Sequence, residues 1–250
     1  MYLRYTISGH IYISPEDDCN NIADAILVTD YDQDFCLAGD FEPEFIARLM
    51  EAGFLVMSVN LSENDTEPDY ILMPRLHLVR SALFFENLHI KKSIKRFLNR
   101  YELRPDAAFE FILDRCVEKH NSDWLTPPLV ECIKKIRSAA NDAYGNTGGE
   151  NDSGRLTPSE NARPASFALY REGKLVAGEF GVVCGRVYTS YSGFYDEDNA
   201  GTVQIILAAR HLQEQGFLFL DLGMPLDYKK DLGAIDISAE EFVSLFRVGN

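Results

Sequence analysis

A single carboxylate follows a short apolar run near the C-terminus. Phe217 to Leu220 are all apolar, and Asp221 comes next. A run of this length, preceded by Gly216, is typical of a buried strand, so Asp221 would stand where that strand ends. An acid in this place can orient a reacting amine, or it can cap a nearby turn or helix N-terminus. Spacing alone favours the cap.

A second group of residues could bind phosphate. Between His89 and Arg104 the chain has one acid, Glu102, and six basic residues. The basic residues are Lys91, Lys92, Lys95, Arg96, Arg100 and Arg104. Arg80 lies just upstream. In a helix, residues four apart share a side, so this segment predicts a local positive patch. Because the whole chain has a formal net charge of −15, only such a patch could serve nucleic acid. The alternative is a solvated helix face.

Other kinds of site are disfavoured. The five histidines and five cysteines show no spacing typical of metal ligands, so we expect no metal. The cysteines are scattered, which indicates reduced, mostly buried thiols. No apolar run approaches the roughly 20 residues of a membrane span, and no signal peptide is evident. We expect a soluble cytoplasmic protein with no membrane partner.

The order of predicted elements indicates an α+β fold. Residues 165–195 predict three strands joined by turns at 171–174 and 184–186, followed by an amphipathic helix and the buried strand at 217–223. This is an acetyltransferase-like order. Other predicted elements are strands at 25–29 and 54–59, helices at 42–53, 91–100, 109–116 and 126–137, a flexible loop at 139–164, and a strand or short helix after 231.

Five stretches in order resemble the leucyl/phenylalanyl-tRNA–protein transferase family. They are "AGDFEPEFIARLMEAGF", "LHIKKSIKRF", "DWLTPPLVECIKKI", "GKLVAGEFGVVCGRVYTSYSGFYDEDNAG", and "HLQEQGFLFLDLGMP" with "LGAIDISAEEF". They correspond to the family's GGDL, LHISRS-KR, TWIT, GG-YG with GESMF, and HL---GF-LIDCQ stretches. The resemblance covers roughly residues 39–242 and identifies the chain as a divergent member.

The resemblance implies a fold and an activity. The fold would be a small N-terminal α/β domain, residues 1–85, and an acetyltransferase-like mixed-sheet domain of the GNAT type, residues 86–250. The activity would be transfer of leucine or phenylalanine from aminoacyl-tRNA to the N-terminal amine of a protein that begins with Arg or Lys, marking it for degradation. Implied partners are the charged tRNA and the acceptor N-terminus. We expect no cofactor and a monomer.

The resemblance also implies site residues. Asp221, which matches the Asp of the DCQ motif, would be catalytic and would orient the attacking amine. Trp124 would be a platform near the terminal adenine or, alternatively, a core residue. The substrate-binding residues would be Trp124, Glu179, Tyr191, Ser192, Gly193, Phe194, Asn199 and Gly223. The tRNA-binding residues would be Arg80, Lys91, Lys92, Lys95 and Arg96.

Four of these positions depart from the family. Gly223 replaces the glutamine of DCQ, while Tyr191 and Gly193 replace the glutamate and methionine of GESMF. Glu179 replaces an apolar residue near the implied donor pocket. Either Glu179 faces away, or the pocket accepts a polar or cationic group, since burying an unpaired carboxylate is costly.

Two other functions therefore stay open. One is a non-catalytic homologue that binds tRNA or protein N-termini. The other is a small-molecule N-acyltransferase, which the segment "DEDNAGTV" disfavours because its three carboxylates would repel the pyrophosphate of CoA.

Overall fold

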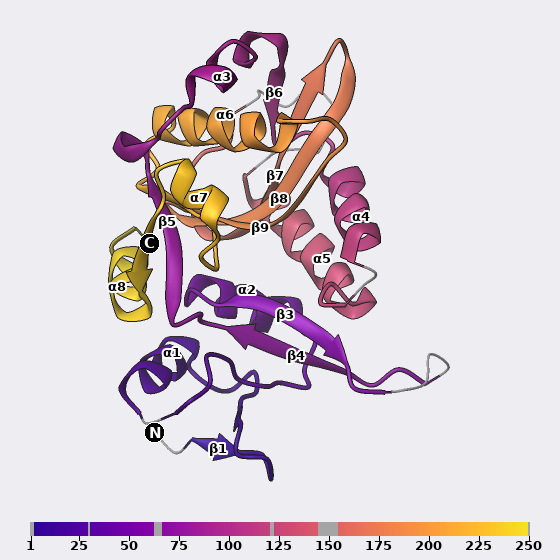
Figure 1. The fold of residues 1–250 in the computed structure, drawn as a ribbon. Helices are drawn as coiled ribbons and strands as arrows, with labels where there is room; N and C mark the ends of the chain where they lie inside the picture. Colours follow the sequence, from indigo (N-terminus) through magenta and orange to yellow (C-terminus); the bar gives the residue numbers. More distant parts are fainter. Residues whose placement is uncertain (1–2, 30, 63–66, 121–122, 145–154, 250) are drawn as a thin grey trace.

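A seven-stranded sheet joins strands from distant parts of the chain. The computed structural model describes residues 3–29, 31–62, 67–120, 123–144 and 155–249. The strand order is β11-β5-β10-β9-β8-β7-β6, and within it only β10 and β9 are parallel (Figure 1). The bounds are β5 (Val79–Phe84), β6 (Glu102–Pro105), β7 (Ser159–Arg171), β8 (Lys174–Gly185), β9 (Val187–Tyr195), β10 (Phe219–Asp221) and β11 (Ile235–Ser238). The predicted α+β class is confirmed.

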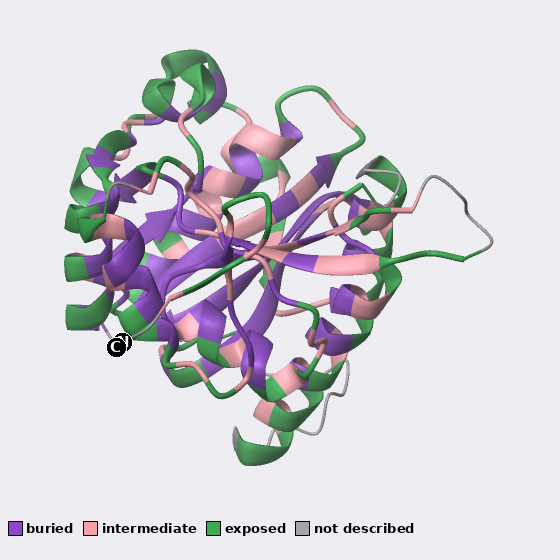
Figure 2. Cartoon of the chain, turned by 90° about the horizontal axis from the view of Figure 1, so that it is seen from below, coloured by how far each residue is buried: buried purple, intermediate pink, exposed green. Residues whose placement is uncertain are grey.

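Helices cover both faces of this sheet. Helix α6 (Ala200–Glu214) packs on one face, and α2 (Pro43–Glu51), α4 (Phe109–His120) and α5 (Pro127–Tyr144) pack on the other (Figure 1). Side chains alternate along β8 as a strand requires. Phe180 and Val182 enter the core beneath α4 and α5, whereas Val183 enters the core beneath α6. The sheet is therefore buried on both sides (Figure 2).

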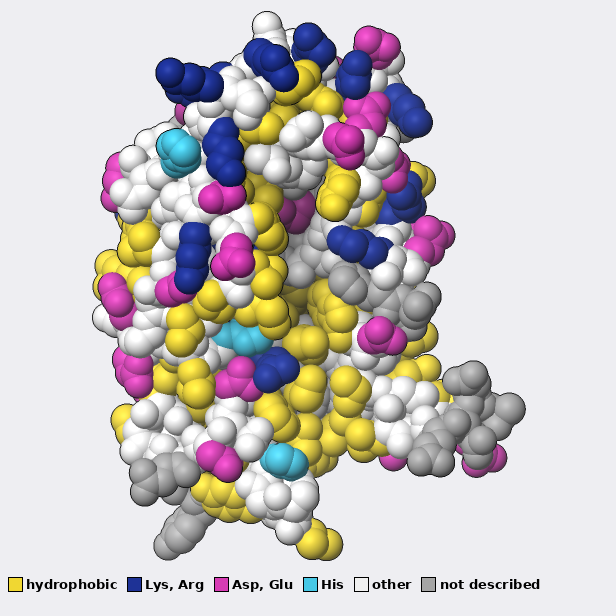
Figure 3. All heavy atoms as spheres, in the orientation of Figure 1, with side chains coloured by type: hydrophobic (Ala, Val, Ile, Leu, Met, Phe, Trp, Pro, Cys, Tyr) yellow, Lys and Arg dark blue, Asp and Glu magenta, His cyan; other side chains and the backbone are white. Residues whose placement is uncertain are grey.

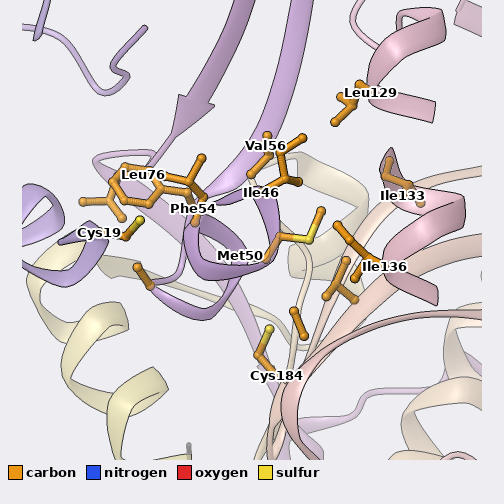
Figure 4. Close-up of a cluster of buried hydrophobic side chains, with 14 of the residues drawn as sticks. Cys19, Ile46, Met50, Phe54, Val56, Leu76, Leu129, Ile133, Ile136 and Cys184 are labelled. Carbon is orange, nitrogen blue, oxygen red and sulfur yellow. The ribbon is translucent and has the colours of Figure 1, made fainter. Parts of the chain in front are cut away.

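The N-terminal part shares its core with the large sheet. Its elements are β1 (Arg4–Tyr5), β2 (Ile11–Tyr12), α1 (Cys19–Val28), α2, and the hairpin of β3 (Leu55–Asn60) and β4 (Tyr70–Arg75). Met50 of α2, Ile133 of α5 and Cys184 of β8 belong to one apolar cluster (Figure 4). Strand β5 precedes residue 85 yet pairs with β10 and β11. The division at residue 85 stays a prediction.

Three predicted elements differ from the structure. Residues 25–29 are not a strand, because they continue α1, where Asp18 caps the Asn21 N–H and Ile22 and Ile26 bury one helical stripe. The helix at 91–100 is only α3 (Lys92–Lys95) and a 3₁₀ turn, η2 (Leu98–Arg100).

The predicted loop is also shorter. Helix α5 extends to Tyr144 and β7 begins at Ser159, while residues 145–154 lie outside the described part.

The remaining predictions agree well. The turns at 171–174 and 184–186 join β7 to β8 and β8 to β9. After β10 come α7 (Asp227–Asp231), β11 and α8 (Ala239–Gly249), and η1 (Phe85–Asn87) follows β5. All five cysteines are free and buried. Within the described ranges, no helix is long and apolar enough to cross a membrane.

Candidate functional site

A cavity opens where two parallel strands separate. The pairing of β10 with β9 ends at Asp221 and Thr189, but β9 continues for six residues to Tyr195. The chain after β10 turns away at Gly223. The freed end of β9 and residues 222–229 form two walls of the cavity, α6 forms a third, and β3 and β4 close the far side. A hollow lined by apolar side chains crosses the middle of this face (Figure 3).

All eight predicted substrate-binding residues line this cavity. Its volume is about 800 Å³. The predicted residues on its walls are Trp124, Glu179, Tyr191, Ser192, Gly193, Phe194, Asn199 and Gly223. They come from β8, β9 and three connecting segments, so only the folded chain brings them together.

A β-bulge in β9 leaves Tyr191 outside the regular pairing with β8. Phe180 pairs with Ser192 and Gly181 pairs with Ser190, so Tyr191 is the extra residue. A Cβ at Gly181 would lie 2.3 Å from the Thr189 carbonyl oxygen, so the bulge requires glycine there. The Tyr191 hydroxyl accepts from the Val56 N–H at 3.2 Å and donates to the Phe54 carbonyl at 3.4 Å. Tyr191 therefore ties β9 to β3.

Trp124 stands beside this tyrosine at the cavity. The two ring centroids are 6.4 Å apart. The Trp124 side chain is partly exposed, although it also packs on the main core. Its place on the wall supports the predicted role as a stacking platform.

Asp221 lies beneath the cavity wall and is fully buried. Both of its carboxylate oxygens accept hydrogen bonds from the Arg80 guanidinium, and Oδ1 also accepts the Gly223 N–H at 2.9 Å. Asp221 is not among the residues that line the cavity. The side chain thus holds a turn, as one of the two sequence interpretations expected. Its catalytic role remains a prediction.

Arg80 corrects a sequence prediction. Its side chain is fully buried between Asp221 and Phe242, with its guanidinium carbon 4.1 Å from the Phe242 ring centroid. It also donates to the Leu76 carbonyl at 3.2 Å. A tRNA phosphate cannot reach this group, so the expectation that Arg80 binds tRNA is wrong. Arg80 instead neutralises Asp221 inside the core.

Gly223 has a backbone conformation that favours glycine. Its φ is +72°, the left-handed region that side chains avoid. Its carbonyl accepts the Ser81 N–H at 2.7 Å, which fixes the turn against β5. A glutamine here would be strained even though its Cβ would make only an ordinary contact, 3.7 Å from Leu55 Cδ1.

Glu179 faces the cavity, so the first of its two expected placements is wrong. Its carboxyl is 4% exposed, and burial raises its pKa to about 7. Ser190, Gln204 and Tyr188 are near enough to oppose that rise as hydrogen-bond donors. None of them reaches Oε1 with hydrogen-bond geometry.

Lys229 and Gln204 are cavity residues that sequence reasoning missed. The Lys229 ammonium donates to the carbonyls of Leu222 at 2.5 Å and Met224 at 2.7 Å, and burial lowers its pKa. Gln204 is 3% exposed on the sheet-facing side of α6. A polar residue on an otherwise apolar stripe is the one signal that could have indicated it.

One carboxylate holds two further side chains of the cavity wall. Asp34 pairs with Arg75 at 2.7 Å and with His77 Nδ1 at 3.3 Å, and both partners line the cavity. Hydrogen bonds from His77 and then Arg75 lower the pKa of Asp34 to about 2. This carboxylate therefore fixes the side chains of Arg75 and His77 in the cavity wall.

The other predicted tRNA-binding residues lie on an exposed crest. Lys92, Lys95 and Arg96 are exposed on and beside α3, where basic side chains gather at the upper end of the view (Figure 3). Lys91 pairs with Asp231 at 2.6 Å. The name basic crest is used below for Lys91, Lys92, Lys95 and Arg96.

The start of α6 is less acidic than its sequence suggests. Asp196 pairs with Arg115 at 2.8 Å and Glu197 pairs with Arg171 at 2.9 Å, while Asp198 lines the cavity. Asn199 precedes the helix with φ of 67°.

Across the described residues, no group of three or more His, Cys, Asp or Glu side chains could hold a metal ion.

Comparison with known proteins supports the resemblance. Residues 156–247 match the model of a family described as leucyl/phenylalanyl-tRNA protein transferase. Over these residues the chain is similar to that family. A protein named leucyl/phenylalanyl-tRNA–protein transferase from Pseudomonas entomophila is 30% identical over 170 residues, 65% of each chain. One of the same name from Maridesulfovibrio salexigens is 26% identical over 215 residues, 84% of this chain and 78% of that one.

The extent of these matches is limited. The chain covers slightly less than two thirds of the length of the Pseudomonas relative. Among solved structures, a GCN5-related N-acetyltransferase from Kribbella flavida covers 90% of this chain, and 73% of that chain is matched. The TM-score is 0.36 and the identity 13%.

Proposed function

We propose that this chain is an aminoacyl-tRNA–protein transferase. It moves an amino acid from charged tRNA to the N-terminal amine of a protein, which is thereby marked for degradation in the cytoplasm. The observation that carries the proposal is the single cavity on which all eight family-matched substrate residues meet. The names of the relatives support the same reaction class.

The reaction needs little covalent help from the protein. The acceptor amine attacks the ester carbonyl, a C–N bond forms, the C–O bond to the 3′-adenosine breaks, and the amine proton passes to the leaving oxygen. Because the ester is already activated, positioning supplies most of the acceleration. Trp124 would stack on the terminal adenine, and the freed end of β9 would hold the aminoacyl group.

Asp221 would act as a positioning residue in this mechanism. Its carboxylate fixes Arg80 and the Gly223 N–H, which shape the wall beside the reacting groups. It is too enclosed to touch the acceptor amine without a rearrangement. The basic crest would receive the phosphates of the tRNA acceptor arm, and the acceptor would begin with Arg or Lys as in the family.

A transfer assay tests the proposal. Purified protein is mixed with tRNA pools charged with each labelled amino acid and with peptides that begin with Arg, Lys, Asp or Glu. We expect label in a peptide, reduced about 10-fold by Trp124→Leu because a stacked base is lost. Tyr5→Leu, an exposed aromatic on β1, is the control.

Failure of transfer would favour the non-catalytic alternative. If tRNA binds but no pool yields labelled peptide, the chain is a binding homologue. The full engagement of Asp221 by Arg80 is the observation that keeps this alternative open.

A further inference from the structure

The buried end of the cavity is polar. An aliphatic or aromatic ligand would be bound better by apolar side chains. Glu179, Gln204 and Tyr188 approach one another there from β8, α6 and β9. All three are at least 96% buried. Glu179 Oε1, Gln204 Nε2 and the Tyr188 hydroxyl each lack a hydrogen-bond partner within the described chain. Buried polar atoms are normally satisfied, so this group is a candidate point of contact for a bound polar group.

What the group lacks is positive charge. Ser190, Gln204 and Tyr188 are neutral, and no described cation lies within ion-pair distance of Glu179. Lys229 acts on Glu179 only from farther away, because its ammonium is held by two carbonyl oxygens. A carboxylate surrounded by neutral donors and short of a counter-ion is suited to bind a cation.

We propose that this end of the cavity is a subsite for a cationic group, and that it receives the side chain of the transferred amino acid. The donor would thus carry an amine or guanidine side chain instead of that of leucine or phenylalanine. The inference rests on the proposed function, because it assumes that the cavity holds an aminoacyl group.

The walls suit such a side chain along its length. An aliphatic stem would pack against Phe194, Ile205 and Leu222, which line the same cavity as Glu179. The charged end would pair with Glu179 Oε1, and the Tyr188 hydroxyl lies beside the same carboxyl. A leucine or phenylalanine side chain would instead leave the Glu179 carboxylate without a counter-ion, which disfavours binding by about 10-fold or more.

Binding of small donor analogues tests the subsite without tRNA. The probes are 3′-amido adenosines that carry lysyl, arginyl, leucyl or phenylalanyl groups, measured by titration calorimetry and by the fluorescence of Trp124, the only tryptophan. We expect the lysyl and arginyl probes to bind wild-type protein at least 10-fold more tightly than the leucyl probe at pH 8.

Two substitutions of Glu179 assign the effect. Glu179→Gln keeps the shape and removes the charge, and it should weaken the lysyl probe by about 10- to 100-fold. Glu179→Met should bring leucyl and phenylalanyl probes ahead of lysyl. Glu214→Gln, an exposed acid on α6, is the matched control and should change none of these affinities. Circular dichroism checks that each variant is folded.

The pH dependence gives a readout that a merely structural glutamate would not produce. Affinity of the lysyl probe should rise from pH 6 to pH 8 as Glu179 ionises, and this rise should vanish in Glu179→Gln. The other titratable groups that interact with Glu179 are Tyr188, Tyr228, Lys229 and Cys116. The leucyl probe carries the same α-amine, so it controls for titration of the probe.

The outcomes separate the two proposals. The subsite is overturned if wild-type protein binds the leucyl or phenylalanyl probe more tightly than the lysyl and arginyl probes. It is also overturned if a Glu179 variant changes the choice of acceptor peptide but not the choice of donor. Transfer of leucine and not of lysine would overturn the subsite and keep the proposed function. Tight lysyl binding without any transfer would keep the subsite and overturn the proposed function.

Discussion

Asp221 and Arg80 form a buried ion pair that joins β10 to β5. Both side chains are essentially inaccessible to solvent. Removing one partner leaves the other charge buried and uncompensated, which is far more destabilising than the loss of a surface pair. We expect Asp221→Ala to lower the free energy of unfolding by about 3–5 kcal/mol.

Urea denaturation followed by circular dichroism measures this loss. Asp236→Ala is the control, because Asp236 pairs with Lys230 on the surface and should lose less than about 1 kcal/mol. A similar small loss for Asp221→Ala would mean that Arg80 finds water or another partner. Because Asp221→Ala affects the fold, it cannot by itself prove a catalytic role.

Glu179 makes stability depend on pH in the unbound protein. Its pKa is raised by burial to about 7, above the value of 4.5 expected when unfolded. The native state therefore holds a proton that the unfolded state has lost, and stability falls as pH rises from about 5 to about 8. The full loss is about 3 kcal/mol. Glu179→Gln should remove this dependence.

Thermal unfolding at pH 5, 6, 7 and 8 checks the prediction. As pH rises, the melting temperature of wild type should fall relative to that of Glu179→Gln. Parallel curves for the two proteins would show that Glu179 does not titrate in this range.

At the scale of elements, the turn after β10 shapes the cavity wall. Gly223 is the position where the family resemblance implies a glutamine, and its φ of +72° suits glycine. Gly223→Gln should therefore lower stability by about 1–2 kcal/mol without raising transfer activity. Gly223→Asn, which tolerates this backbone better, should lose less. A gain of activity in Gly223→Gln would show that the turn rearranges to place the amide in the site.

The elements that the sequence predicted well are those defined by local pattern. The three strands β7, β8 and β9 have apolar residues on both faces and glycine-containing turns between them, and α6 ends before Gly216. The strand predicted at 25–29 was wrong, because its apolar residues also fit a helical stripe begun by the Asp18 cap. Short apolar runs fit both periods.

The site was predicted less completely because its key contacts are distant in sequence. Arg80 and Asp221 are 141 positions apart, and nothing local shows that one neutralises the other. The bulge at Tyr191 and the polar neighbours of Glu179 also depend on strand register. The family resemblance did select eight residues that line one cavity, because motifs shared with a family carry tertiary information that periodicity lacks.

For the whole molecule, tRNA must approach a protein with a formal net charge of −15. The basic crest is the exposed positive surface of α3, whereas several surface cations elsewhere in the described chain, such as Arg104, Lys135 and Arg247, have carboxylate partners. If the crest contacts phosphates, its removal should weaken tRNA binding at low salt and flatten the salt dependence. The triple variant Lys92→Ala, Lys95→Ala, Arg96→Ala tests this.

The control must match the change in net charge, because long-range repulsion alone could weaken binding. Lys135→Ala, Lys174→Ala, Arg210→Ala removes three exposed cations elsewhere, so both triple variants go from −15 to −18. Filter binding of tRNA between 50 and 300 mM KCl should show a slope of log affinity against log salt that falls by about 2–3 in the crest variant only. Equal effects of the two triples would mean that tRNA responds to overall charge, and the crest would then be an ordinary solvated helix face.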